Sequence, residues 1–143
     1  MAKSINTDNS LLKLIFNGTA WANIADNAAT SPYTQLYISL HSADPGTGDA
    51  QTTNEVAYTN YTRIAIARTS GGWTVSTNNA TNAALAQFPQ CGASGATITH
   101  VAIGTASTGA GHVLYAGALS SSLAVSNGIQ PQFAIGALQV TES

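Results

Sequence analysis

Three histidines and many hydroxyl side chains are the residues of this sequence that could take part in catalysis. His41, His100 and His112 lie in unrelated local contexts, and only His100 and His112 are expected to approach each other, across neighbouring strands. Serine and threonine are abundant, but no Gly-x-Ser-x-Gly elbow marks one of them as an activated nucleophile. A hydrolytic site needs a base or paired carboxylates beside its nucleophile. The sequence therefore predicts a protein that is not an enzyme and has no cofactor.

A group of acids, Asp44, Asp49 and Glu55, suggests a calcium site, because hard cations bind several oxygen ligands. Their spacing does not fit an EF-hand loop. Asp44-Pro45-Gly46 is instead a common turn triplet, whose Asp accepts a local backbone hydrogen bond. We therefore predict a turn and no metal site.

The few charged residues exclude further classes of function. Four basic and six acidic side chains give a net charge of −2, so no cationic surface is available for nucleic acid. The single cysteine, Cys91, cannot form an intrachain disulfide and is expected to be a small structural thiol. Met1 to Ser4 lack the apolar core of a signal peptide, and no apolar stretch is long enough to span a bilayer. We expect a protein made in the cytoplasm, with no membrane or nucleic-acid partner.

The charged residues are also unevenly distributed. From Thr69 to Thr141 the chain contains no Asp, Glu, Lys or Arg and is rich in Ala, Ser, Thr, Gly and Asn. A freely diffusing monomer usually keeps a charged surface, which favours a neutral half that is covered in an assembly. The alternative is a β-domain whose uncharged polar surface is fully solvated, because hydroxyls and amides also make a surface polar.

One helix is expected, over residues 8–17. Its cap is Asp8, Asn9 or Ser10, and Asn17-Gly18 ends it. Its apolar face packs against its own domain or lies on a neighbouring subunit. Residues 18–32 are expected to form an ordered connection.

Beyond the helix, the hydrophobic pattern predicts strands. Leu36, Ile38 and Leu40 alternate with polar or aromatic residues, which indicates a strand over 35–41 with one buried face. Residues 61–68 and 73–75 are predicted to form a hairpin around Ser70-Gly71-Gly72, and Asn127-Gly128 to form a type I′ hairpin. Further short strands are expected at 84–88, 97–103, 113–116, 123–125, 129–135 and 137–141.

This pattern of short strands separated by turns predicts an all-β fold, an antiparallel β-sandwich of jelly-roll or immunoglobulin-like type with a short N-terminal α-helix. The expected organisation is an N-terminal arm and helix over 1–18, followed by one β-sandwich domain over 19–143.

Aromatic and basic side chains are the strongest candidates for an interface. Aromatic residues dominate both cores and interfaces, so each of them has two interpretations. Arg63 and Arg68 are expected to pair with acids such as Glu55, within the fold or across subunits. The interface candidates are Leu11, Lys13, Phe16, Tyr37, Tyr58, Tyr61, Arg63 and Arg68.

Several segments, in this order, resemble a group of small virion proteins of tailed bacteriophages, often labelled tail-fibre-like and in some cases capsid decoration or cement proteins. The resemblance covers roughly residues 10 to 140 and implies a non-enzymatic structural subunit, symmetric in assembly and repeated many times on a virion. The segments are Leu36-Tyr37-Ile38-Ser39-Leu40-His41-Ser42-Ala43-Asp44-Pro45-Gly46, Asn54-Glu55-Val56, Tyr61-Thr62-Arg63, Thr99-His100-Val101-Ala102-Ile103-Gly104 and Leu114-Tyr115-Ala116-Gly117-Ala118-Leu119.

Two functions follow from this resemblance. The first is a capsid decoration or cement protein on the capsid exterior, which binds the major capsid protein and stabilises the assembled head by mass action. The second is a subunit associated with the tail or a tail fibre, bound to a tail protein and in contact with the host. A homo-oligomer is expected in either case, with a trimer preferred.

Overall fold

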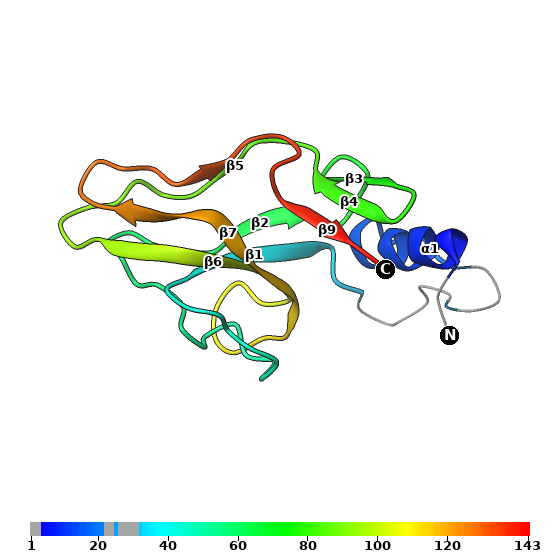
Figure 1. Cartoon of the computed structure of the whole chain (residues 1–143), viewed down its shortest axis with the longest axis horizontal. Helices are drawn as coiled ribbons and strands as arrows, with labels where there is room; N and C mark the ends of the chain where they lie inside the picture. Colours follow the sequence, from blue (N-terminus) through cyan, green and yellow to red (C-terminus); the bar gives the residue numbers. More distant parts are fainter. Residues whose placement is uncertain (1–3, 22–24, 26–31) are drawn as a thin grey trace. The chain divides into compact units, whose positions relative to one another are not determined.

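The computed structural model describes residues 4–21, 25 and 32–143. Strands make up 39% of this part of the chain and helix 9%. The predicted fold class, an antiparallel β-sandwich with one short N-terminal helix, is confirmed. The elements in chain order are α1 (Ile5–Phe16), β1 (Gln35–His41), β2 (Ile64–Ala67), β3 (Trp73–Ser76), β4 (Asn79–Asn82), β5 (Ala86–Gln87), β6 (Ala96–Gly104), β7 (Val113–Val125), β8 (Gln132–Phe133) and β9 (Gln139–Thr141) (Figure 1).

The chain divides into two compact units. The helix unit comprises the described residues of Met1–Gln35, Ile66–Ala86 and Phe133–Ser143, and the loop unit comprises Leu36–Ala65 and Gln87–Gln132. The predicted division into an arm over 1–18 and a β-domain over 19–143 stays a prediction.

Helix α1 begins earlier than predicted. Its N-cap is Ser4, whose hydroxyl accepts a 3.3 Å hydrogen bond from the Thr7 amide, so the predicted caps Asp8, Asn9 and Ser10 are wrong. Asp8 instead lies in the first turn, where a carboxylate interacts favourably with the helix dipole. The predicted end is confirmed: Asn17 is the C-cap and Gly18 has a φ of 62°, a left-handed conformation that suits glycine.

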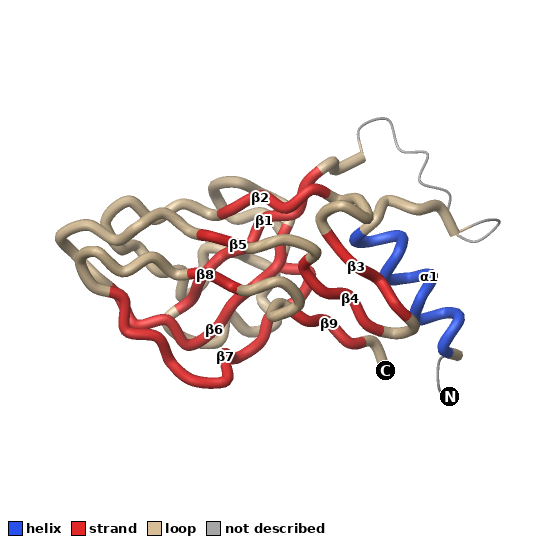
Figure 2. Tube along the Cα trace, turned by 90° about the horizontal axis from the view of Figure 1, so that it is seen from above, coloured by secondary structure: helices blue, strands red, loops and turns tan. Residues whose placement is uncertain are grey.

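The core of the helix unit forms where α1 packs against β3 and β4. Strand β4 lies between β3 and β9 in an antiparallel sheet (Figure 2). The Phe16 and Trp73 rings, both without exposed surface, have centroids 4.6 Å apart. Leu12 of α1 is equally buried. The apolar face of α1 therefore packs against its own chain.

The sheet that contains β1 supplies the framework of the loop unit. Its strand order is β2-β1-β6-β7, and β1 pairs with β6 in an antiparallel register that places His41 opposite His100. The predicted strands 113–116 and 123–125 are parts of the single strand β7. Its register against β6 shifts twice, between Ile98 and His100 and between Ile103 and Gly104.

Both predicted hairpins are wrong, although turns do occur at both places. β2 belongs to the sheet of β1, whereas β3 pairs with β4. β7 pairs with β6, and β8 pairs with β5. At Asn127-Gly128 the Ile129 amide donates to the Ser126 carbonyl at 2.9 Å, and only Gly128 of the two turn residues has a positive φ, 87°. A type I′ turn requires positive φ at both positions, and a single positive value at the third turn residue fits a type II turn.

Strand β4 was not predicted at all. Its Asn-Ala-Thr-Asn sequence lacks the apolar alternation that signals a strand, yet it is the central strand of its sheet. The predicted ordered connection over 18–32 lies largely outside the described residues, apart from its two ends and an isolated bridge between Trp21 and Ala25.

Candidate functional site

The candidate site of the loop unit lies where β1 ends and a long loop, 42–63, begins. Asp44 starts this loop by accepting a 2.8 Å hydrogen bond from the Gly46 amide, which confirms the predicted turn. The Asn54 side chain then donates to the Asp44 carbonyl at 2.8 Å. The Val56 amide donates to the Leu40 carbonyl at 2.9 Å. The loop thus returns to the end of β1, and the side chains of residues 51–55 come close to the strand.

Four residues, Gln51, Glu55, Tyr61 and Arg63, hold this loop in place, and we call them the clamp. The central contact joins Arg63 and Glu55, which form two hydrogen bonds of 2.7 Å each, from Nε to Oε1 and from Nη2 to Oε2. Their side chains are 3% and 15% exposed. The hydrogen bond to Glu55 raises the pKa of Arg63. This two-point geometry fixes orientation as well as distance, and it confirms the predicted pairing of Arg63 with Glu55 within the fold.

The remaining donors of Arg63 reach a second loop, 105–112. Nη1 donates to the Ala106 carbonyl and Nη2 to the Gly109 carbonyl, each at 2.8 Å. A guanidinium has five N–H donors in a rigid fork, so a single Arg63 side chain can connect the two loops, whereas a lysine could not reproduce this arrangement.

Tyr61 connects the same carboxylate to the backbone of β1. Its hydroxyl donates to Glu55 Oε1 at 2.8 Å and accepts from the Leu40 amide at 3.0 Å. Burial raises the pKa of this hydroxyl far above its ordinary value, so it stays protonated. The ring packs between the Tyr58 ring, with centroids 5.3 Å apart, and the Phe88 ring, at 6.4 Å.

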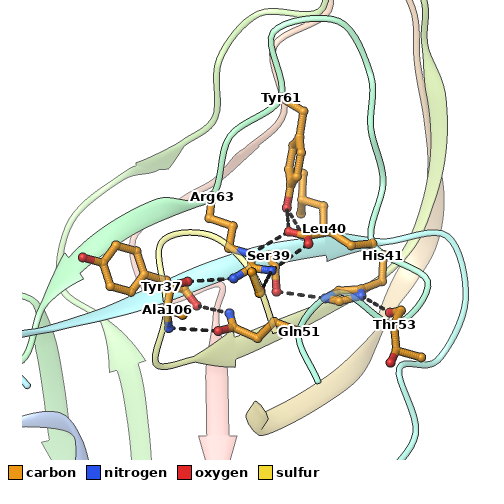
Figure 3. Close-up of polar contacts among 11 residues, drawn as sticks. Tyr37, Ser39, Leu40, His41, Gln51, Thr53, Tyr61, Arg63 and Ala106 are labelled. Atoms are coloured by element: carbon orange, nitrogen blue, oxygen red, sulfur yellow. Dashed lines mark hydrogen bonds and ion pairs between the residues drawn. The ribbon is translucent and has the colours of Figure 1, made fainter. Parts of the chain in front are cut away.

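Gln51 is the fourth clamp residue and has no exposed surface. Its side chain accepts from the Ala106 amide at 3.0 Å and donates to the Tyr37 carbonyl at 3.4 Å (Figure 3). A Cβ at Gly104 would lie 2.1 Å from this side chain, and one at Gly111 would lie 2.5 Å from it. The two glycines therefore leave the space that Gln51 occupies.

The clamp places an uncharged loop tip next to an exposed contact between a histidine and a carboxylate. Ser107 to Ala110 are exposed. His112 Nδ1 lies 2.6 Å from Asp49 Oδ2, and these side chains are 65% and 58% exposed. The Val113 amide donates to the Asp49 carbonyl at 3.2 Å, so this second contact also joins the loops. A buried network thus presents hydroxyls and backbone groups on the surface in one conformation.

A serine and a histidine lie together beneath the loop. Ser39 Oγ is 2.9 Å from His41 Nε2, and His41 Nδ1 is 2.8 Å from the Thr53 carbonyl (Figure 3). The spacing matches that of a nucleophile and its base, but both side chains have no exposed surface, so a substrate cannot reach them. Burial lowers the pKa of His41. These contacts hold the Thr53 segment against β1.

The histidines and acids that the sequence suggested for a catalytic or metal site lie apart from one another in the structure. His100 faces His41 across β1 and β6, whereas His112 binds Asp49, so the expected approach of His100 to His112 is wrong. Asp44, Asp49 and Glu55 enter three different interactions. Within the described residues, no three His, Cys, Asp or Glu side chains gather as a metal site would require. Cys91 is buried, as expected of a structural thiol.

Seven of the eight predicted interface residues fall into three groups. Phe16 and Tyr58 are buried within the chain, at 0% and 2% exposure, so their side chains are not available on its surface. Arg63 and Tyr61 belong to the clamp. Leu11, Lys13 and Tyr37 are half-buried, and their role in an interface stays a prediction.

Arg68, the eighth candidate, differs from what was predicted. It donates to the backbone carbonyls of Leu14, Ile15 and Tyr33, and its pairing with an acid is not among these contacts. The Leu14 and Ile15 carbonyls lie near the C-terminal end of α1, where a cation is favourable because of the helix dipole.

Sequence reasoning missed Gln51, Ser39 and His41 as parts of the site. Alternation predicted one buried face for β1, but Ser39 and His41 on its other face are buried as well. The only signal was the pair of glycines, Gly104 and Gly111, whose missing side chains admit Gln51. Because Gln51 is more than fifty residues away from these glycines, the local sequence pattern does not indicate that they are in contact.

A comparison with protein families confirms the resemblance to small virion structural proteins of tailed bacteriophages. A family model described as Podophage GP4 fiber I protein gp80 matches residues 2–141, and the chain belongs to this family. No curated protein matches the sequence. The described part of the chain contains no helix with the length and apolar character needed to cross a bilayer.

Proposed function

We propose that this protein is a non-enzymatic subunit of the phage tail or of a tail fibre, and that it contacts its partner through the two clamped loops. The fibre description of its family favours the tail over the capsid exterior. A neighbouring tail protein, or a further copy of the chain, is the partner that a structural subunit requires. A homo-oligomer, with a trimer preferred, is part of this proposal.

The observation that carries the proposal is the use of charge in the clamp. A buried ion pair contributes little net stability, because desolvation of both ions offsets their attraction. Arg63 and Glu55 are two of only ten charged side chains, four basic and six acidic. Here they are used to hold two loops, and loops on a rigid framework are where proteins most often place binding surfaces. The clamp thus supports a preorganised contact surface, which lowers the entropic cost of binding.

Immunogold labelling of intact particles tests the location. Label confined to the tail is expected. Uniform label over the head would overturn the proposal and support a capsid decoration protein bound to the major capsid protein.

Substitution at the loop tip tests the surface. Thr108→Arg adds a large charged side chain at an exposed position of the 105–112 loop. Incorporation into particles is expected to fall at least tenfold, because the added side chain prevents close approach. Thr97→Arg, at an exposed position of β6 in the same unit and outside both loops, is the matched control and is expected to be incorporated normally. Equal incorporation of both variants would contradict the assignment of the loops.

A further inference from the structure

Strand β7 forms one edge of the sheet β2-β1-β6-β7, and within the described residues β6 is its only strand partner (Figure 1). Every second residue of an edge strand directs its backbone N–H and C=O away from the sheet, where they can pair with another strand. Proteins usually protect such an edge with charged side chains or proline. The 13 residues of β7, Val113–Val125, include neither. β7 therefore has the chemistry of a strand that pairs with another chain.

The middle of β7 is uncovered on both faces of the sheet. Ala116, Gly117 and Ala118 are consecutive exposed residues, and consecutive residues of a strand point to opposite faces. The pairing of β7 with β6 is regular from Tyr115 to Ala118, with register shifts on either side. A second strand can therefore align along the outer edge of this regular stretch.

Nothing in the described part of the chain requires a glycine at position 117. Its φ is not positive, and a Cβ added to Gly117 would meet no atom within 4 Å. A glycine in the interior of a strand reduces stability, because it loses the most conformational freedom and has no side chain to pack. Such a glycine often marks a place where another backbone approaches closely. The open space at Gly117 thus suits a side chain from a second strand.

The sequence of β7 is complementary to itself about Ala116. In a two-fold antiparallel pair, facing side chains lie on the same side of the sheet, so one residue lies opposite its own copy. With Ala116 at the axis, Tyr115 of one copy faces Gly117 of the other, and Leu114 faces Ala118. Each large side chain then lies beside a small residue, and an aromatic residue opposite an edge glycine is a favourable pair.

We propose that β7 is an interface between two copies of this chain, at which the two strands pair antiparallel about Ala116 and join their sheets. This contact deepens the proposed function, because it assigns a surface to the homo-oligomer and rests on that part of it. It joins copies two at a time, which gives a dimer, or pairs of trimers where a threefold contact is also present. A second copy is favoured over a strand of another protein, because it brings an uncharged edge with matching side chains.

Sedimentation equilibrium of the purified protein, over a concentration series, tests whether copies pair. An even number of copies is expected. A monomer at every concentration would overturn the β7 contact, and so would a trimer alone. The trimer would leave the homo-oligomer of the proposed function intact, so the two failures can be told apart.

Charge substitution at the axis tests the register. Ala116→Lys places two like charges opposite each other and should weaken pairing at least about tenfold, and Ala116→Glu should do the same. An equimolar mixture of the two variants brings opposite charges together and should restore pairing. Thr74→Lys, at an exposed position of β3, is the matched control and should pair like the unchanged protein. A mixture of folded variants that stays unpaired would overturn the proposal.

A cysteine at the axis gives a test that does not depend on charge. Residues directly opposite each other in an antiparallel pair have Cα atoms about 4.5–5.5 Å apart, a distance that a disulfide can span. Ala116→Cys should therefore form a cross-linked dimer under mild oxidation, whereas Thr74→Cys should not. Cys91 is buried and does not compete. Absence of the Ala116→Cys dimer would overturn the proposal. Thr108→Arg, which tests the loops on particles, should leave pairing through β7 unchanged.

Discussion

The helix unit and the loop unit are stabilised by different chemistry. In the helix unit the largest enclosed side chain is Trp73, which packs on the Phe16 ring of α1. In the loop unit the enclosed charged pair of Arg63 and Glu55 holds the two loops together. Apolar burial stabilises many similar arrangements, whereas a buried ion pair strongly disfavours any arrangement that separates its members. The loop unit also has an apolar core, which includes Leu36, Phe88 and Ile98, so the charged pair that favours one loop conformation is what distinguishes it from the helix unit.

The largest expected loss of stability comes from removing the apolar contact in the core of the helix unit. Trp73→Ala should cost about 3–5 kcal/mol of unfolding free energy, because it leaves a cavity against Phe16. Denaturant unfolding followed by circular dichroism measures it. Trp73→Phe is the matched control and should cost less than half as much, because a ring remains and the indole nitrogen has no hydrogen-bond partner within the described residues. A loss below about 1 kcal/mol for Trp73→Ala would remove the contrast between the units.

The second prediction concerns the loss of the cation from the Arg63–Glu55 pair of the loop unit. Arg63→Met should cost about 3 kcal/mol, because it leaves the Glu55 carboxylate enclosed without its cation. Arg68→Met is the control in the helix unit. It removes hydrogen bonds to carbonyls but leaves no buried charge, so about 1–2 kcal/mol is expected. Thermal and denaturant unfolding of both variants compares them.

A double variant tests whether the cost of Arg63→Met comes from the unpaired Glu55 carboxylate. Arg63→Met combined with Glu55→Leu removes both charges and should recover part of the stability lost by Arg63→Met alone. The same variant should still lose the protection of loop 105–112 in hydrogen exchange, because the contacts to Ala106 and Gly109 are gone. An Arg68→Met variant that is less stable than Arg63→Met would contradict the special role of the clamp.

A polar hub in the helix unit provides the third prediction. The Asn82 side chain donates to the Ala84 and Ala134 carbonyls at 2.8 and 2.9 Å and accepts from the Leu138 amide at 2.9 Å. Asn82→Ala should cost about 2 kcal/mol, because it leaves enclosed backbone groups without partners. Asn79→Ala, on the opposite face of β4, loses only a long side-chain contact to Thr141 and should change stability by less than about 0.5 kcal/mol. Similar losses for both would show that β4 depends on its strand pairing rather than on the hub.

The sequence predicted local features of both units well and long-range partners poorly. Alternation located β1 to the residue, and Asn17-Gly18 located the end of α1, because both signals lie within a few neighbouring residues. The Arg63–Glu55 pair was predicted because few charges were available to pair. The pairing of β3 with β4, and the separation of β7 from β8, depend on which distant strand supplies hydrogen bonds, and neighbouring residues do not encode that choice.

The clamp illustrates the same limit within one site. Ser39 and His41 looked like the solvent-facing residues of an alternating strand, and a loop returning from residues 51–55 covers them. Gln51 has no sequence signal of its own, since its place depends on the space beside Gly104 and Gly111. Residues that act through a loop crossing back over a strand are therefore the ones that sequence reasoning misses.

The smallest expected effect on stability tests the uncharged stretch 69–141, which contributes residues to both units. Ser120→Lys with Ser122→Lys adds two charges to exposed positions of β7 and should change the unfolding free energy by less than about 0.5 kcal/mol. Ser120→Gln with Ser122→Gln is the uncharged control of similar length. If β7 is covered in the assembly, the lysine variant alone should fail to form oligomers in sedimentation velocity, because its charges would lose solvation at the contact. Normal assembly of the lysine variant would mean that this surface is solvated, and the loops held by the clamp would then be the remaining candidate for subunit contact.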